Sequence, residues 1–313
     1  MRTWLDCDLD RPWRLLAYGD PNVDLMFAVD RAPASNEKVL GRRLGSFAGG
    51  TVANAACAAA ALGCRTQAMG SVGDDADGAF LLDAYAHHGV DSALVRRIAG
   101  AASSCAMVML EPGGEKALVY APVAGEASAA PALDAALAVS TLLYSMPYDI
   151  PAFVRMVAAA RGAGTRIAID IEAAMVRREG DAERLLGLAD IVFMNDATYG
   201  ALFGGAPDGE GMRRLLEHGP RLLVVTCGAA GALAATRDET VGHPAFVATL
   251  VDSTGAGDCF NGAFLAALFE GGDLATCLRF ACAAASFAVA QLGARSGIPS
   301  RARIEELLAA QPA

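Results

Sequence analysis

The sequence predicts an α/β protein in which helices cover both faces of a mostly parallel β-sheet. From about residue 131 onward, short apolar runs typical of buried strands alternate with helical segments. Such strands are joined by right-handed crossovers, which place the helices on both faces of the sheet. The chain has 313 residues, 54% of them hydrophobic, so it can bury a sizeable core.

The chain begins with a predicted strand, a polar segment and a helix. Residues 14–19, RLLAYG, have the pattern of a buried strand that ends in a turn. The following DPNVDLMF is a loop or a strand on which Asn22 and Asp24 face the same side. A Gly-Gly turn and an Ala-rich helix come next, with Asn54 near the first turn and Gly63 at the end.

A β-hairpin then interrupts the alternation. TQAMGSVG predicts a strand, and DADGAFLLDAYAHHG predicts a helix with an acidic start and a glycine stop. Residues 104–120 alternate in hydropathy and turn at Pro-Gly-Gly, which predicts the hairpin. We expect two lid segments, near 36–47 and 103–121.

The second half is regular. Its predicted strands are TLLYS, RIAID, IVFMN and LLVVT, which are separated by helices, and they are followed by GALAAT, a short β stretch, a glycine turn and three closing helices. Because no repeat or linker is evident, we expect a single domain over residues 1–313. In open α/β sheets, ligands bind beyond the carboxyl ends of the strands. Five residues lie at or just after such ends: Asn22, Gly49, Asn195, Thr226 and Gly255.

Charge and composition exclude several classes of partner. The net charge is −10, and no basic cluster exceeds a pair of arginines, which argues against nucleic acids and anionic membranes. The acidic N-terminus does not fit a signal peptide, and no apolar run approaches the roughly 18 residues of a membrane span. We therefore expect a cytoplasmic protein. Its eight cysteines include no CxxC pair, and we expect them to be reduced and buried. Cys259, beside Asp258, is the one candidate for chemical modification, although no neighbouring His suggests a nucleophile.

The segment VDSTGAGDCFNGAFLAALF carries the strongest chemical signal. A Gly-Ala-Gly turn that opens a helix directs unpaired backbone N–H groups and the positive end of the helix dipole at its ligand, so it attracts anions. Asp258 in that first turn either caps the helix or acts on a bound molecule. The segment alone leaves both interpretations open.

Two motifs identify a resemblance. AGGTVANAACAAAALGCRTQAMGSVGDD, residues 48–75, and DSTGAGDCFNGAFL, residues 252–265, lie about 200 residues apart with VVTCGAAG between them. In this order they resemble the ribokinase family, also called the PfkB carbohydrate kinases, from about Arg14 to Ile304. The resemblance implies a three-layer α/β/α ribokinase-like fold with a mostly parallel central sheet and a small β lid.

The resemblance also implies roles for individual residues. Asp258 corresponds to the base that accepts the proton of the substrate hydroxyl, and the backbone N–H groups of Gly255, Ala256 and Gly257 correspond to the anion hole. The positions that correspond to sugar-binding residues are Asn22, Asp24, Gly49, Gly50 and Asn54. The positions that correspond to the ATP site are Asn195, Thr226, Gly228 and Gly231. Those that correspond to a monovalent-cation loop are Asp252, Thr254, Ala288, Gln291 and Gly293.

Three positions depart from the family pattern. Thr198 stands where the family has a Glu that helps organise Mg²⁺, and Asp196 nearby would point elsewhere if a helix begins there. Ser145 stands where ribokinase has a sugar-binding Glu, which puts ribose specificity in doubt. Gly297 stands where ribokinase has a Ser, which weakens the expectation of K⁺.

The implied function is an ATP-dependent carbohydrate kinase that uses Mg²⁺ and, in many family members, K⁺. Its substrate would be a small sugar of the ribose, fructose or ketodeoxygluconate type, phosphorylated at a primary hydroxyl. A nucleoside kinase is the main alternative, with Phe27, Met107, Met109 and Tyr120 as the wall for a base. A sensor that has lost catalysis is a further alternative, motivated by Thr198. The lid strands also offer an edge for a homodimer.

Overall fold

The structure is a computed structural model that describes residues 7–112, 116–124 and 130–311. Its centre is a nine-stranded sheet. The strand order is β13 (Thr240–His243), β12 (Ala232–Ala235), β11 (Leu222–Thr226), β10 (Ile191–Asn195), β9 (Arg166–Asp170), β8 (Ser140–Ser145), β1 (Trp13–Tyr18), β4 (Thr66–Gly73) and β5 (Asp91–Ile98). All neighbours pair in parallel except β12, which is antiparallel to both β11 and β13.

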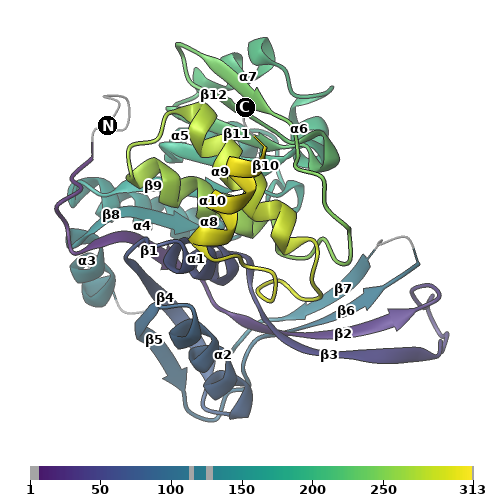
Figure 1. Ribbon diagram of the computed structural model, residues 1–313. Coiled ribbons are helices and arrows are strands. Elements are labelled where there is room, and N and C mark those ends of the chain that lie inside the picture. The colour runs from purple at the N-terminus through teal and green to yellow at the C-terminus, as the bar shows by residue number, and fades with distance from the viewer. Residues whose placement is uncertain (1–6, 113–115, 125–129, 312–313) are drawn as a thin grey trace.

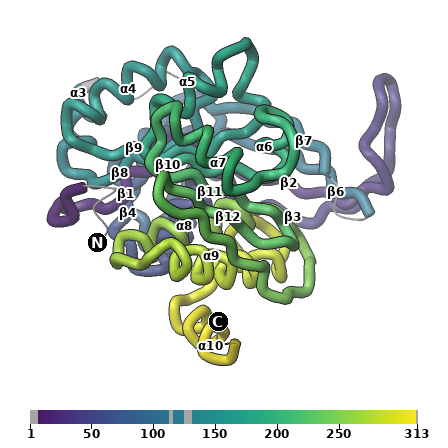
Figure 2. The backbone as a smooth tube through the Cα atoms, turned by 90° about the horizontal axis from the view of Figure 1, so that it is seen from above, coloured from purple at the N-terminus to yellow at the C-terminus, as the bar shows by residue number. Residues whose placement is uncertain are grey.

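Helices cover both faces of this sheet, as predicted, and Figure 2 shows the two helical layers on either side of it. One layer consists of α1 (Thr51–Ala61), α2 (Ala76–His87), α8 (Ala256–Phe269), α9 (Leu274–Ala288) and α10 (Arg301–Ala310). The other consists of α3 (Ala130–Ala138), α4 (Ile150–Gly162), α5 (Asp181–Leu188), α6 (Asp196–Phe203) and α7 (Gly209–Leu216). Strand side chains alternate between the layers, so that Leu15 packs in the first and Leu16 in the second. None of these helices, over the residues described, is long and apolar enough to cross a membrane.

Small residues allow α1 to lie between the sheet and α8. Most of α1 is buried, and five of its buried residues are alanine. Gly262 of α8 sits directly against it, since a Cβ at that position would lie 2.4 Å from the carbonyl oxygen of Ala55. This close approach brings the N-terminus of α1 next to that of α8, and both termini contribute to the cavity described below.

A second sheet of four strands projects from one side of the main body (Figure 1). Its order is β3 (Gly41–Gly49), β2 (Asn22–Val29), β6 (Cys105–Leu110) and β7 (Lys116–Ala121). The predicted hairpin is present as the antiparallel pair β6 and β7, although residues 113–115 of its turn lie outside the described residues. The segment expected near 36–47 contributes most of β3, and DPNVDLMF is a strand rather than a loop.

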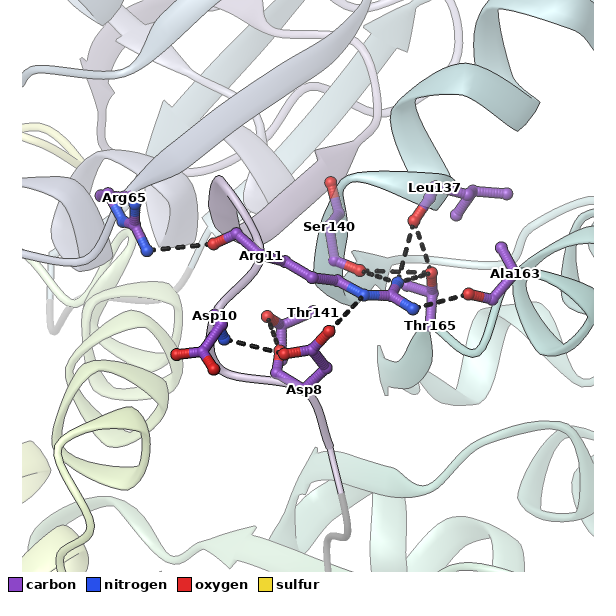
Figure 3. A network of polar contacts seen from close by, with 9 residues as sticks. All are labelled: Asp8, Asp10, Arg11, Arg65, Leu137, Ser140, Thr141, Ala163 and Thr165. Atoms are coloured by element: carbon purple, nitrogen blue, oxygen red, sulfur yellow. Dashed lines mark hydrogen bonds and ion pairs between the residues drawn. The ribbon is translucent and has the colours of Figure 1, made fainter.

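Arg11 ties the segment before β1 to the main sheet (Figure 3). Its guanidinium donates to the carbonyl oxygens of Leu137 at 3.2 Å, Ser140 at 2.7 Å and Ala163 at 2.7 Å. It also donates to Thr165 Oγ1 at 3.0 Å. Leu137 and Ala163 lie at the C-terminal ends of α3 and α4, where carbonyl groups lack helical partners and a cation is favourable. The Arg11 side chain thereby provides hydrogen-bond donors to carbonyl groups at the C-terminal ends of two helices.

Candidate active site

A cavity of about 790 Å³ lies at the carboxyl ends of the central strands, between the N-termini of α1 and α8 and under β2, β6 and β7. Ten of the predicted site residues line it: Asn22, Asp24, Gly50, Asn54, Asn195, Thr226, Thr254, Gly255, Gly257 and Asp258. The others lie outside its walls: Gly49, Ala256, Gly228, Gly231, Asp252, Ala288, Gln291 and Gly293. Residues from distant parts of the chain therefore meet in one place, as the strand-end rule predicts.

Asp258 lies in the first turn of α8 and contacts a residue of α1. The Nδ2 of Asn54 donates a hydrogen bond to Asp258 Oδ2 at 2.8 Å. Burial raises the pKa of Asp258 to about 7, while the hydrogen bond from Asn54 acts in the opposite direction. Such a carboxyl exchanges its proton near neutral pH, which is the range that suits a general base.

The N-terminus of α8 is shaped to receive an anion. The helix begins after Gly255, which has φ of 75° and provides no side-chain cap. A Cβ on Gly255 would lie 2.6 Å from the Ala294 side chain, so this turn accepts only glycine. Thr254 Oγ1 is buried beside the turn with no hydrogen-bond partner among the described residues. The Ala256 N–H donates to the Ser253 carbonyl oxygen at 3.3 Å. The backbone at Gly255 and Gly257, which lines the cavity, and the unpaired Thr254 hydroxyl fit a bound phosphate group.

The opposite side of the cavity presents polar groups for hydroxyls. Asn22 Nδ2 donates to Asp24 Oδ1 at 2.6 Å, and both side chains are buried. Gly49 contributes by having no side chain, since a Cβ would lie 2.2 Å from Asp24 Oδ2. Gly50, with φ of 97°, caps α1, and its carbonyl oxygen accepts the Asn54 N–H at 2.7 Å. Asn22, Asp24, Gly49 and Gly50 therefore form one compact corner at the edge of the cavity.

Sequence analysis missed several residues of the cavity wall. Asp170 ends β9 and Glu172 follows it, and the same strand-end rule would have found them. The Nδ2 of Asn261 donates to Asp170 Oδ2 at 2.9 Å, one helical turn after Asp258. Burial raises the pKa of Asp170 well above its ordinary value, and the Asp258 carboxylate raises it further. Tyr148 donates from its hydroxyl to Glu172 Oε2 at 2.6 Å.

The residues expected at the ATP site lie at the ends of β10 and β11 or in the turn after β11. Asn195 caps α6, and its Oδ1 accepts the Thr198 N–H at 2.7 Å. Asp196 begins the helix and is not among the cavity-lining residues, so it does not replace the Glu. Thr226 ends β11 and lines the cavity. The turn with Gly228 and Gly231 connects the antiparallel strands β11 and β12 and lies beyond the wall.

Asp252 joins the two loops of the expected cation site. Its Oδ1 accepts the Thr254 N–H and its Oδ2 accepts the Gly293 N–H, each at 2.9 Å. A Cβ at Gly297 would lie 2.7 Å from the Ala288 carbonyl oxygen, so the loop packs tightly there. Within the described ranges, no cluster of three His, Cys, Asp or Glu side chains offers a metal site by itself.

Two expectations about side chains are wrong. Cys259 is buried with 1% of its surface exposed, and burial raises its pKa to about 12, so it is not a reactive thiol. Phe27, Met107 and Met109 do not line the cavity, because strand alternation directs them to the other face of the small sheet. Tyr120 does line it.

Comparisons with known proteins agree with this geometry. Residues 14–301 match the family described as pfkB family carbohydrate kinase. The chain is 31% identical to a ribokinase of Bacillus subtilis over 93% of its own length and 97% of that protein. It is 28% identical to a nucleoside kinase of Methanothermobacter thermautotrophicus over 95% and 96% of the two chains.

Solved structures extend the likeness to the fold. Arabidopsis thaliana ribokinase complexed with ribose and ATP superposes with a TM-score of 0.80 at 26% identity, covering 94% of this chain and 98% of that one. A ribokinase from Giardia lamblia gives a TM-score of 0.83 at 24% identity, with 95% and 100% covered. The predicted three-layer fold is thereby confirmed.

Proposed function

The chain belongs to the pfkB carbohydrate kinase family and is a phosphotransferase with an alcohol acceptor, and from this premise we propose that it phosphorylates a neutral sugar. The observation that carries the proposal is the position of Asp258. Its carboxylate lines the cavity in the first turn of α8, beside the uncapped N–H groups and opposite Asn22 and Asp24. A base, an anion site and hydroxyl-binding groups are what phosphoryl transfer to an alcohol requires.

In the proposed reaction, Asp24 and Asn22 orient the sugar so that one hydroxyl lies against Asp258. Asp258 accepts the hydroxyl proton as the oxygen attacks the γ-phosphorus of ATP. The bond to the β-phosphate oxygen breaks, and ADP leaves with its electron pair. The backbone N–H groups at Gly255–Gly257 stabilise the charge on the transferred group. The small sheet over the cavity excludes water, which limits ATP hydrolysis.

Charge within the cavity favours a neutral acceptor over a sugar acid. Five acidic side chains line the cavity: Asp20, Asp24, Asp170, Glu172 and Asp258. Lys116 is the single Lys or Arg among the described lining residues. An acceptor with its own carboxylate would be repelled in a site of low dielectric constant. Among the substrate types expected from the sequence, the ketodeoxygluconate type is therefore the least suited.

The test is ADP release with Mg²⁺-ATP across ribose, fructose, 2-keto-3-deoxygluconate and nucleosides. We expect turnover with a neutral acceptor and a loss of at least about a thousandfold in the Asp258→Asn variant. The control is ATP binding by that variant, which should persist because Asn keeps the shape of the site. Near-normal turnover by Asp258→Asn would remove the basis of the proposed mechanism.

A nucleoside is the second candidate acceptor. The aromatic ring of Tyr120 and the apolar side chains of Val108, Leu118 and Met146 line the cavity and form a wall suited to a base. The nucleoside kinase relative supports this candidate. Competition of the preferred sugar by adenosine, inosine or pseudouridine would distinguish the two. We do not retain the sensor alternative, because the relatives named above are kinases.

We propose ATP as the phosphoryl donor and Mg²⁺ as its counterion. Mg²⁺ commonly keeps several waters and is held largely by phosphates, which fits a site where the described residues offer no group of three His, Cys, Asp or Glu side chains for a metal. The ion would lie with the ATP phosphates near Asn195 and neutralise their charge. The loop around Asp252 would take K⁺ through carbonyl oxygens, and higher turnover in K⁺ than in Na⁺ or choline salts would support that assignment.

We also propose a homodimer through the small sheet. The face turned away from the cavity carries Leu25, Phe27, Met107, Met109 and Val119, which pair across β2, β6 and β7. Met107 and Val119 are exposed. A continuous apolar face of this kind is typical of an interface, and a second copy offers a matching surface of the same composition.

A further inference from the structure

Arg295 is a buried cation behind the cavity. It follows α9, has 6% of its surface exposed and is not among the cavity-lining residues. Its Nε donates to Asn54 Oδ1 at 2.8 Å, and its Nη2 donates to the Gly49 carbonyl oxygen at 2.5 Å. Its guanidinium lies 5.4 Å from the ring centre of Tyr85. Burying a charge is costly, so this arrangement calls for a reason beyond packing.

The orientation of the Asn54 side-chain amide provides that reason. An amide has a donor end and an acceptor end and can rotate by 180° to exchange them. Arginine has only donors, so the Arg295 Nε contact requires Asn54 to turn its Oδ1 toward α9. Nδ2 then necessarily faces Asp258, to which it donates at 2.8 Å. Without Arg295, the reversed amide would present oxygen to the carboxylate.

We propose that Arg295 is a positioning residue for phosphoryl transfer: through Asn54 it orients the Asp258 carboxylate, and through Gly49 it fixes the corner that holds Asp24. The inference rests on the proposed role of Asp258 as the base. Arg295 contacts neither the cavity nor the reacting atoms. It acts through the 2.8 Å contacts on the two sides of one amide.

The orientation of Asn54 also affects the basicity of Asp258. The charged groups that face Asp258 include Asp24 and Glu172, which raise its pKa, and Lys116, which lowers it. Asp170 faces it as well, and the Asp258 carboxylate raises the pKa of Asp170. The Asn54 hydrogen bond lowers the pKa as well, because it stabilises the ionised form. If the amide were free to rotate, part of that stabilisation would be lost, and the pKa of Asp258 would rise.

The experiment measures the titration of Asp258 directly in the full chain. In protein with ¹³C-labelled aspartate, the Asp258 carboxyl signal is assigned by its absence from Asp258→Asn. In Arg295→Met we expect its midpoint to rise by about one pH unit, and kcat at pH 7 to fall about fivefold with an unchanged KM for ATP. Adding Arg295→Met to Asn54→Ala should change kcat by less than about twofold, because the pathway is already interrupted.

Arg295→Gln provides a rescue that a purely structural role does not predict. Glutamine places its amide nitrogen where arginine has Nε, so it can still donate to Asn54 Oδ1 although it carries no charge. We expect its Asp258 midpoint to stay within about 0.3 units of the wild type. This variant also provides the test if Arg295→Met does not fold. Arg303→Met is the matched control, since Arg303 stacks over Phe287 at 4.7 Å in α10, away from the cavity.

Different outcomes separate this inference from the proposed function. An unchanged midpoint in Arg295→Met, a shifted midpoint in Arg295→Gln, or additive effects with Asn54→Ala would overturn the positioning role. If Asp258→Asn transferred phosphate at a normal rate, the proposed function would fail instead, whatever the behaviour of Arg295.

Discussion

Asp258 has to lose a proton to act as a base, yet its surroundings oppose that loss. Its pKa in the folded protein is raised to about 7, from 3.8 for an ordinary Asp, with burial as the largest cause. Between these two values the folded chain keeps the proton that the unfolded chain releases. The stability that the neutral carboxyl contributes is therefore present at low pH and is lost as the pH rises toward and through 7.

The first residue-scale prediction concerns stability. Asp258→Asn is neutral at every pH, so it should match the wild type only below about pH 3.8. Its advantage should grow up to about pH 7, so that it exceeds the wild type by more at pH 8.5 than at pH 5, by a few kcal/mol at most. Thermal unfolding at the two pH values measures this difference. Asp10→Asn, which removes an exposed carboxylate, should show no comparable gain. An advantage of Asp258→Asn that did not change with pH would contradict the assignment.

The second concerns the rate. Only the ionised form of Asp258 accepts a proton, so kcat should rise about tenfold per pH unit below about 7 and level off above it. A pH profile of kcat, recorded with saturating acceptor and ATP, measures this rise below pH 7. A rate that stayed constant from pH 5 to 8 would show that another group, or none, takes the proton.

Among the secondary-structure elements, α8 depends most on a single backbone conformation. Gly255 combines φ of 75° with direct contact to Ala294. We expect Gly255→Ala to lower both the melting temperature and kcat, because the turn must move away from its anion-binding shape. Gly271 is the matched control, since it has φ of 88° and open space around its Cα.

The two alanine variants separate the cost of a positive φ from the cost of a steric clash with Ala294. Gly271→Ala should lose about 1 kcal/mol of stability from its backbone conformation alone, with kcat unchanged. Gly255→Ala should lose more and also reduce turnover at least about tenfold. Equal losses in both variants, measured by thermal unfolding and by ADP release, would mean that the contact with Ala294 is unimportant.

Helices and strands with a clear hydrophobic pattern could be predicted from the sequence. Features that depend on contacts between distant parts of the chain could not. The strands of the second half are short apolar runs between helices, and each is present. β5 was missed because Arg96 and Arg97 break its apolar pattern at an end of the sheet. Asp258 and Asn22 stood out by their motifs. Arg295 did not, because its importance comes from contacts with residues more than 200 positions away.

On the scale of the whole molecule, the proposed dimer makes a direct prediction. Sedimentation equilibrium should give twice the chain mass of 32.1 kDa. Val119→Lys places a charge on the apolar face of the small sheet and should shift the mass toward that of the monomer. Val247→Lys is the control, since Val247 is also exposed but lies in another loop. A monomeric wild type at micromolar concentration would rule out the interface.

The contacts of Arg11 affect how far the chain can be truncated without loss of structure. The region shared with the family begins at residue 14, after Arg11, and ends at residue 301, before the fully buried Ile304. A fragment trimmed to the shared region would contain every strand of both sheets, except for Trp13 at the start of β1. It would nevertheless lack the Arg11 guanidinium, which binds the C-terminal ends of α3 and α4, and all of α10 after its first residue, including the buried Ile304. The region that matches the family, residues 14–301, is therefore shorter than the stretch of chain that packs together in this fold.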